Sequence, residues 1–403
     1  MDDVDAAGLG IGDDYPPRIM GVLNVSEESP YDPSVFDEPD EAAAYVDAEL
    51  IGEGADIVDV GLESANKRFD VLSAEQELDR LDTAVETLEA TSGDAVWSIE
   101  TRYAEVAEAA LDRGFDMVND ITGFADPEMP EVCREYDVAV AKMASPPDLT
   151  KPGAVRATPW VERESAEWAE RADYVDQVYE ALTQNGLTDK TIVDPAFGRW
   201  SEDQTIEDDR ETFRRLREFR GLDRPMLVSI NRKTFLRSVA DRSTEDALPV
   251  SLAATSMAVE RGAHVVRTHD VAETLDAALV GDTFSRARSH SGRDESADGE
   301  ITVEELDVRT PDEAARHFER ADATDVDPGT AVSRVYAVDG LDESTRERLR
   351  TAASAAGCRF VARPDGDEGF LYGSCSSLAS LADRTDVPRP LAGTLATDGV
   401  TDR

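Results

Sequence analysis

The chain has 403 residues, 40% of them apolar, which suffices to bury a sizeable core in more than one domain. Its 87 acidic residues outnumber the 41 basic ones, and the formal net charge is −46. A surface this acidic repels nucleic acids and anionic membranes, and it stays soluble where concentrated salt screens its self-repulsion. The composition therefore predicts a cytoplasmic protein of a high-salt environment, with neither nucleic acid nor membrane partners. An acidic disordered protein is excluded, because the apolar positions recur too regularly.

The cysteines and the apolar runs also indicate a soluble protein. Cys133, Cys358 and Cys375 are an odd number without paired spacing, which argues against a disulfide framework and against a cysteine zinc site. No apolar run approaches the ~18 residues that a membrane span needs. The acidic start of the chain is also unlike the basic start of a signal peptide. We therefore expect reduced cysteines in a soluble protein.

After an acidic lead-in at residues 1–17, short apolar runs and helical patterns alternate eight times. The short runs are typical of buried strands, and the stretches between them have apolar residues at helical spacing. The expected strands lie at residues 19–25, 56–61, 95–99, 115–118, 138–143, 191–193, 226–230 and 265–266. The expected helices lie at residues 41–54, 74–90, 103–113, 127–136, about 159–187, 212–219, 246–262 and 271–287.

This alternation predicts a (β/α)₈ TIM barrel over residues 18–287. Strands that alternate with helices pair in parallel through right-handed crossovers, and eight such units of this length fit a closed barrel. The alternative is an open, doubly wound sheet. That fold favours a glycine-rich phosphate loop after the first strand, where this chain has only Gly21.

A second, smaller domain is expected after the barrel. Residues 288–300 are polar and contain serine and glycine, so we interpret them as a linker. Residues 301–395 then show strand and helix patterns of a small α+β domain, followed by a tail at 396–403. This domain shows no cluster of catalytic side chains, and its role stays open at this point.

Polar side chains collect at the ends of the eight expected barrel strands. In a TIM barrel these ends build the active site, because the loops that follow the strands meet at one face. A single polar residue there is explained by the change from strand to loop, but a whole set is not. The set comprises Asn24, Gly61 to Glu63, Glu100, Asn119 and Asp120, Lys142 and Met143, Asp194, Asn231 to Lys233, and Arg267 to His269.

The chemistry of this set divides it into two groups. Glu100, Asn119, Asp194 and Lys233 offer acceptors, an amide and an ammonium, which suit the edge of a flat, nitrogen-rich heterocycle. Arg267, His269 and Asn24 belong to the last and first strands, which are neighbours in a closed barrel. Arginine suits phosphate oxygens, and an asparagine oxygen suits Mg²⁺, which commonly shares its shell with substrate phosphates. The sequence thus predicts a heterocycle pocket beside a metal-assisted diphosphate site.

These motifs resemble those of one known family, dihydropteroate synthase, at seven of the eight strands and over roughly residues 18–285. Each motif is weak alone, but seven in the right order are specific. The similar stretches are Ile19 to Val25, Asp59 to Ser64, Ser98 to Glu100, Val118 to Asp120, Asp194 to Gly198, Ser229 to Lys233 and Arg267 to Asp270.

The resemblance implies a reaction in which 6-hydroxymethyl-7,8-dihydropterin diphosphate loses pyrophosphate and 4-aminobenzoate attacks the exposed methylene. Catalysis in the family is mainly electrostatic, since negative charge grows on the leaving diphosphate. By the resemblance, Asn24 is a ligand of the cofactor Mg²⁺, and Arg267 and His269 hold the diphosphate. Glu100, Asn119, Asp194 and Lys233 bind the pterin, with Lys233, Arg267 and His269 as the catalytic residues. A homodimer is also expected, as is common in the family.

Some positions depart from the family pattern. Glu100 stands where the family usually has aspartate, and Ala65-Asn66, followed by Lys67 and Arg68, stand where it has Thr-Arg. The first loop lacks the family's phenylalanine and glycine pair, although Tyr31 lies in it, and Ala144 replaces a histidine. Two alternatives therefore stay open: a pterin-binding barrel with another acceptor or a methyl-transfer reaction, and a non-catalytic pterin-binding protein. Arg232 either bridges the two halves of the site or points into the helix layer.

Overall fold

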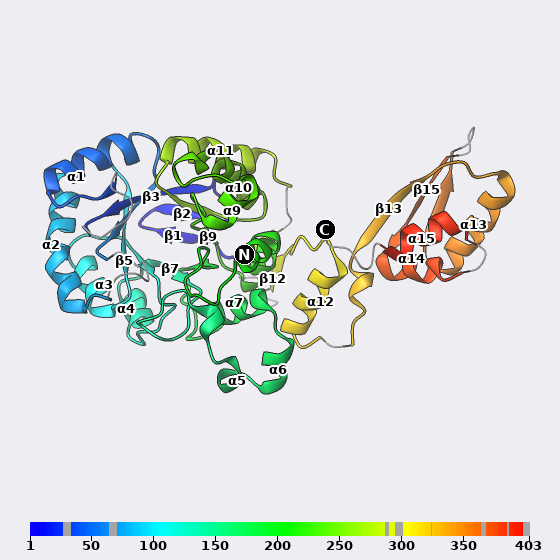
Figure 1. Ribbon diagram of the computed structural model, residues 1–403, viewed down its shortest axis with the longest axis horizontal. Coiled ribbons are helices and arrows are strands. Elements are labelled where there is room, and N and C mark those ends of the chain that lie inside the picture. The colour runs from blue at the N-terminus through cyan, green and yellow to red at the C-terminus, as the bar shows by residue number, and fades with distance from the viewer. Residues whose placement is uncertain are drawn as a thin grey trace. The chain divides into compact units, whose positions relative to one another are not determined.

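The computed structural model describes residues 1–26, 34–63, 71–286, 290–294, 301–323, 325–363, 368–384 and 387–397. The chain divides into two compact units, Met1–Glu305 and Leu306–Arg403 (Figure 1). The sequence predicts a linker at residues 288–300. In the structure, part of that stretch, β11 (His290–Asp294), pairs antiparallel with β12 (Ile301–Glu304), and both belong to the first unit.

Eight parallel strands form the first unit, in the order β8-β7-β6-β5-β4-β3-β10-β9. A parallel bridge between Val193 and Met226 joins the two ends of this sheet and closes it. The predicted (β/α)₈ barrel is therefore confirmed. The strands are β3 (Arg18–Asn24), β4 (Ile57–Gly61), β5 (Val96–Thr101), β6 (Met117–Asp120), β7 (Ala139–Met143), β8 (Thr191–Asp194), β9 (Leu227–Val228) and β10 (Val265–Thr268).

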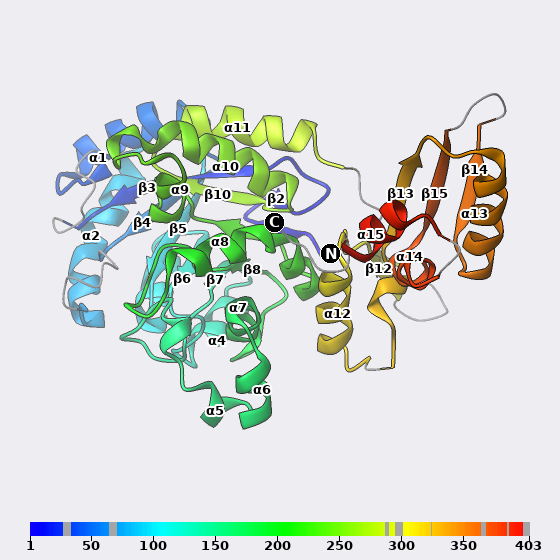
Figure 2. The ribbon, with the colours of Figure 1, turned by 45° about the vertical axis from the view of Figure 1, so that its right-hand side comes forward.

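Helices surround this barrel (Figures 1 and 2). They are α1 (Pro39–Tyr45) with a π-helical continuation (Val46–Ile51), α2 (Ala74–Ala90), α3 (Ala104–Leu111), α4 (Met129–Glu135), α5 (Trp160–Arg163), α6 (Ala166–Arg171), α7 (Tyr174–Thr183), α8 (Ile206–Arg214), α9 (Thr234–Ala240), α10 (Leu248–Glu260) and α11 (Val271–Thr283). Short 3₁₀ segments lie at Val155–Ala157, Leu216–Leu222 and Glu245–Ala247.

The stretch after β7 was predicted as one long helix, but it forms three. Ser165 caps α6 by accepting from the Trp168 amide. Asp173 and Asp176 form a capping box that starts α7 afresh. Ala172 lies between α6 and α7 and has an extended backbone (ψ 125°), so α6 does not continue into α7. Local capping side chains therefore outweigh the continuous apolar spacing here.

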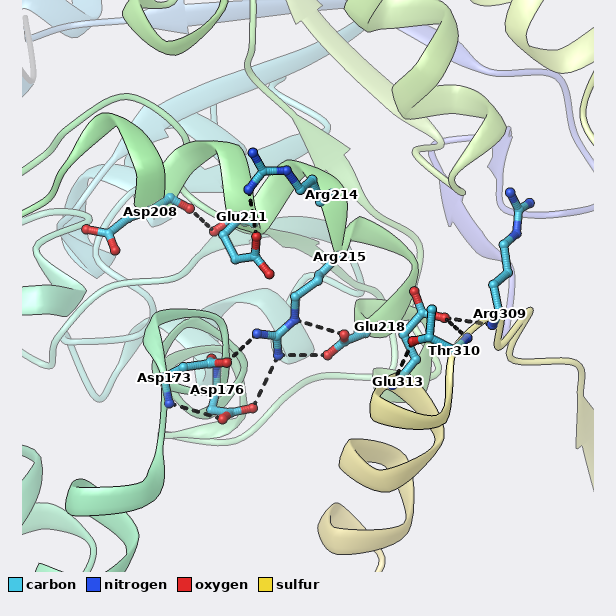
Figure 3. Close-up of polar contacts among 11 residues, drawn as sticks. Asp173, Asp176, Asp208, Glu211, Arg214, Arg215, Glu218, Arg309, Thr310 and Glu313 are labelled. Carbon is cyan, nitrogen blue, oxygen red and sulfur yellow. Dashed lines mark hydrogen bonds and ion pairs between the residues drawn. The ribbon is translucent and has the colours of Figure 1, made fainter. Parts of the chain in front are cut away.

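A buried arginine ties the start of α7 to the end of α8. Arg215 donates to both carboxylate oxygens of Glu218 at 2.9 and 3.0 Å, and it pairs with Asp173 and Asp176 (Figure 3). Arg215 is 4% exposed, and the fork of donors on a guanidinium suits this arrangement of carboxylates. This cluster fixes the helix layer beside β8.

The lead-in at residues 1–17 contains a hairpin, β1 (Val4–Ala6) and β2 (Leu9–Ile11). Its buried side chains Val4, Ala6 and Ile11 join an apolar cluster with one residue or more from each of the eight barrel strands, among them Met20 and Ile57. The hairpin therefore closes the amino-terminal end of the barrel, which is the end that usually serves stability.

A buried ion pair holds the end of this lead-in against the barrel. Arg220 donates to both oxygens of Asp13, at 3.1 and 2.5 Å, and His264 Nε2 lies 3.1 Å from Asp13 Oδ1. The Met226 amide donates to His264 Nδ1 at 3.0 Å, so Nε2 carries the proton and donates to Asp13. Burial alone would raise the pKa of Asp13, but the bonds from His264 and Arg220 outweigh it and hold that pKa well below its usual range.

The second unit is a small α+β domain, as predicted. Its sheet has the antiparallel order β13-β15-β14, and helices lie beside it (Figure 2). The apolar core of this unit includes Leu349, Phe360 and Leu371. The helix α12 starts with a capping box between Thr310 and Glu313 (Figure 3). The elements are α12 (Pro311–Arg320), β13 (Ser333–Val338), α13 (Glu343–Ala355), β14 (Arg359–Ala362), β15 (Gly369–Ser374), α14 (Cys375–Ala382) and α15 (Arg389–Thr397), with a 3₁₀ segment at Pro328–Thr330.

Among the described residues, no helix is both long and apolar enough to cross a bilayer.

We predict that Asp13→Asn lowers the free energy of unfolding by about 3 kcal/mol at pH 7, because it leaves buried Arg220 without its carboxylate. The folded pKa of Asp13 lies below the unfolded one, so this stabilisation is present above about pH 4 and is lost as the pH falls further. Denaturant unfolding in molar KCl at pH 7 and at pH 3 measures it. Asp82→Asn removes an exposed partner of Arg113 and should change stability by less than about 1 kcal/mol. An equal loss of unfolding free energy in the two variants would contradict a stabilising role for the buried Asp13–Arg220 pair.

Candidate active site

The carboxyl ends of the barrel strands hold every residue predicted for the site. Each lies within two residues of a strand end or in the last two residues of a strand, except Lys233, which follows β9 and precedes α9. Asn119 is buried, and Asp194 is 6% exposed. The placement is as follows: Asn24 in β3, Glu100 in β5, Asn119 in β6, Asp194 in β8, Lys233 at the N-cap of α9, Arg267 in β10, and His269 just after β10.

A carboxylate that we did not predict, Asp59, is the centre of the polar network. Its Oδ2 accepts from Arg267 Nε at 2.7 Å and from Asn119 Nδ2 at 2.9 Å, and its Oδ1 accepts from Ser98 Oγ at 2.8 Å. Asp59 is fully buried in β4. A sequence signal was present, since an acid in the middle of the apolar run 57–60 needs a buried partner.

Arg267 joins Asp59 to Glu100. Its second nitrogen donates to Glu100 Oε2 at 2.7 Å, so the guanidinium forms a fork between two carboxylates. Burial raises the pKa of Glu100, Arg267 opposes that rise and Asp59 adds to it. Burial would lower the pKa of Arg267, but Glu100 and Asp59 outweigh it and keep Arg267 charged. The residue expected to hold diphosphate is therefore paired with acids in this state.

Asp194 and Lys233 form the opposite wall. Asp194 Oδ1 accepts from the Ala196 amide at 2.8 Å, and burial raises the pKa of Asp194 to about 6, opposed by that amide and by Lys233. Burial and nearby Arg267 lower the pKa of Lys233. Lys233 Nζ also lies 5.8 Å from the centre of the Trp200 ring, in reach of a cation–π contact.

A glycine makes room for Lys233. Gly198 has φ +131°, which L side chains rarely adopt, and a Cβ there would come within 2.9 Å of Lys233 Nζ. The loop after β8 therefore keeps the space into which the lysine extends.

Asn24 and His269 meet through Ser34. Asn24 Nδ2 donates to Ser34 Oγ at 2.8 Å, and that oxygen lies 3.4 Å from His269 Nδ1. Burial, aided by Arg267, lowers the pKa of His269 to about 3, so its ring is neutral at pH 7. This corner brings the first and last strands together, as their closure in a barrel requires.

The donor set of this corner fits a hard cation that takes most of its ligands from elsewhere. The bond to Ser34 uses the nitrogen of the Asn24 amide, which leaves its oxygen for a ligand. That oxygen lies 3.3 Å from where a Cβ on Gly61 would sit, so the glycine keeps the approach open. Among the described residues no group of three or more His, Cys, Asp or Glu could hold a metal alone. One amide oxygen suits Mg²⁺ that is shared with substrate phosphates and water.

Lys142, a charged residue at the end of β7, stabilises the fold and does not face the candidate site. Lys142 points into the helix layer and donates to the carbonyls of Leu182, Gln184 and Gly186, at the end of α7. Burial lowers the pKa of Lys142 to about 7. Inclusion of Lys142 among the residues facing the site was therefore wrong, because a strand residue can face either side of the barrel wall.

Arg232, whose direction the sequence left open, also points into the helix layer. It makes a two-pronged bond to Asp270, with both distances 2.8 Å, and donates to the carbonyls of Thr244 and Glu245. Asn231 donates to the same carboxylate. The variant positions Tyr31 and 65–68 lie outside the described residues.

Comparison with known proteins places the chain in a family. The profile of the family "Pterin binding enzyme" matches residues 20–269, so the chain belongs to this family. A "probable bifunctional folylpolyglutamate synthase/dihydropteroate synthase" of Halobacterium salinarum is 33% identical over 66% of this chain, but the chain spans only 31% of that relative. The dihydropteroate synthase of Bacillus subtilis is 29% identical over 66% of this chain and 88% of its own length.

The solved structures agree with this assignment. The crystal structure of a Clostridium difficile dihydropteroate synthase in the presence of pteroic acid matches with a TM-score of 0.57 and 28% identity. The match covers 69% of this chain and 99% of that one. The family match ends at residue 269, so the second unit lies beyond it.

We predict that Asp59→Asn lowers the free energy of unfolding by about 3 kcal/mol, because buried Arg267 loses one of its two carboxylates. Pterin binding should fall as well, since Asn119 and Arg267 are held by the same carboxylate. Thermal unfolding and pterin fluorescence titration in molar KCl measure the two effects. Asp56→Asn, at the amino-terminal end of the same segment, is the control and should leave pterin binding unchanged. Unaltered pterin affinity in Asp59→Asn would contradict a central role for this carboxylate.

Proposed function

We propose that the protein is a dihydropteroate synthase that joins 6-hydroxymethyl-7,8-dihydropterin diphosphate to 4-aminobenzoate and releases pyrophosphate. The observation that carries the proposal is the position of Arg267, between the acidic wall of Asp59 and Glu100 and the corner of His269 and Asn24. The pterin-binding family and the names of several relatives support the same reaction. The acidic composition supports work in the cytoplasm at high salt.

The pterin would lie among Asn119, Asp194, Glu100 and Lys233. These side chains offer both donors and acceptors in a largely buried space, and the edge of a pterin ring needs both. The raised pKa of Asp194, about 6, lets this carboxyl accept or donate a hydrogen bond near neutral pH. Fixing the ring in this way aligns its methylene for attack, which is the entropic part of catalysis.

The diphosphate would leave toward Arg267 and His269. Arg267 keeps its charge, and the neutral His269 ring can donate one hydrogen bond to a phosphate oxygen. Negative charge grows there as the bond to carbon breaks, so these donors bind the transition state more tightly than the substrate. Mg²⁺ held by the Asn24 oxygen would neutralise part of the same charge.

The reaction can be tested directly with the purified full chain. The assay contains molar KCl, Mg²⁺, the dihydropterin diphosphate and 4-aminobenzoate, and it measures dihydropteroate and pyrophosphate. We expect both products in equal amounts. Pterin binding without product from 4-aminobenzoate would overturn the proposal. Product with another arylamine, methyl transfer, or binding without turnover would then identify which alternative holds.

We predict that Lys233→Ala weakens pterin binding by about 10- to 100-fold, because a hydrogen bond from a charged donor is lost. The loss of stability should be small, since Lys233 forms no salt bridge with the described residues and extends into space kept by Gly198. Fluorescence titration and thermal unfolding separate the two effects. Lys151→Ala, at an exposed lysine, should change neither. A large fall in melting temperature for Lys233→Ala would mark this lysine as structural.

We predict that Asn24→Ala raises the Mg²⁺ concentration needed for half-maximal rate by about tenfold, because one oxygen ligand is lost. Titration of Mg²⁺ at saturating substrates measures this change. The KM for 4-aminobenzoate should stay within about twofold of the wild-type value. The same Mg²⁺ dependence in the variant and the wild type would remove Asn24 from the metal site.

A further inference from the structure

We propose that Arg102 is a positioning residue, which fixes the turn at Gly61–Glu63 between the two halves of the active site. The proposal rests on the proposed function for its meaning in catalysis. Arg102 follows β5 directly and lies at the carboxyl end of the barrel. No motif singled it out in the sequence.

The guanidinium of Arg102 connects three loops. One nitrogen donates to Glu63 Oε2 at 2.8 Å, in the loop after β4, and the other donates to the carbonyl of Leu149 at 2.6 Å, in the loop after β7. Glu63 Oε1 also accepts from the Leu72 amide at 3.3 Å. Arg102 is 1% exposed, so its loss leaves buried acceptors without their donor, which costs stability.

Arg102 is not the only cation bonded to this turn, since Arg80 donates to the carbonyl of Leu62 at 2.6 Å. Burial raises the pKa of Glu77 to about 8, opposed by the hydroxyl of Thr101, which donates to it at 2.5 Å, and aided by Glu63. Glu77 is therefore largely protonated at pH 7. Glu63 and Arg102 form a buried ion pair, in which two nitrogens of Arg102 are bonded while its Nε has no partner among the described residues.

The turn that Arg102 holds separates the two halves of the site. From the place where a Cβ on Gly61 would sit, the nearest atoms are Asn24 Oδ1 at 3.3 Å, the Glu63 carbonyl at 3.8 Å and Glu100 Oε1 at 3.9 Å. A movement of this turn would therefore disturb the metal corner and the pterin wall together. Displacement by 1 Å can cost about 10²-fold in rate.

A purely structural role predicts a different result, and the chain offers a matched control. Arg220 is also 1% exposed and is paired with a carboxylate, but it lies at the opposite end of the barrel. Arg102→Met and Arg220→Met therefore remove similar buried ion pairs. Both should lower the melting temperature, and only a positioning role makes Arg102→Met slower at saturating substrates.

The experiment compares wild type, Arg102→Met, Arg102→Lys and Arg220→Met as full chains in molar KCl, well below each melting temperature. We expect kcat to fall by about 10- to 100-fold in Arg102→Met, with a smaller weakening of pterin binding, because the turn borders the pterin wall as well as the metal corner. Arg102→Lys keeps the charge but cannot reach both acceptors, so it should recover part of kcat. Arg220→Met should keep kcat within about twofold. Equal kcat in the two methionine variants would overturn the proposal.

Hydrogen exchange gives a readout that does not depend on turnover. The Leu72 amide, bonded to Glu63, should exchange at least about tenfold faster in Arg102→Met than in wild type and Arg220→Met. Unchanged exchange would overturn the positioning role. If the wild type forms no dihydropteroate, the proposed function fails, and the exchange comparison still decides whether Arg102 fixes this turn. If Arg102→Met does not fold, the same measurements on Arg102→Lys decide it.

Discussion

The ion pair between Asp59 and Arg267 is the interaction on which the site depends. A fully buried carboxylate is costly unless it is paired and hydrogen-bonded, and Asp59 meets this need with Arg267, Asn119 and Ser98. These three partners come from β10, β6 and β5. One charge in the middle of β4 thereby fixes the side chains of three other strands, and Glu100 follows because it shares Arg267.

The amino-terminal end of the barrel stabilises the fold, and the carboxyl end carries the polar side chains of the candidate site. At the amino-terminal end, the hairpin of residues 4–11 fills the interior, and Asp13 is locked by Arg220 and His264. At the carboxyl end, some polar side chains of the site are paired with one another. Gly61 and Gly198 leave space there beside Asn24 and Lys233. A rigid base lets the opposite end keep charged groups close together, an arrangement that costs stability but prepares the site for charge in a transition state.

Sequence spacing predicted the barrel and the location of the seven candidate side chains at one end of it, because the carboxyl ends of parallel barrel strands meet at one face. It did not predict Asp59 or Arg102, whose partners lie far away in the chain: Arg267 is 208 residues from Asp59. It also misplaced Lys142, since spacing does not show which side of the wall a strand-end residue faces. The hairpin at 4–11 was not predicted, because each of its strands has only three residues. Such short segments give too little alternation of apolar and polar residues to indicate a strand.

The net charge of −46 repels anions at long range, but the charges close to the site decide whether an anionic substrate binds. At 1 M salt the screening length is about 3 Å, so distant surface carboxylates contribute little at the mouth of the barrel. Buried charges are screened much less, and Arg267 and Lys233 are buried close enough to Asp194 to interact with it electrostatically. An acidic surface in concentrated salt is therefore compatible with the proposed binding of an anionic diphosphate, because the salt screens the surface carboxylates far more than it screens buried Arg267 and Lys233.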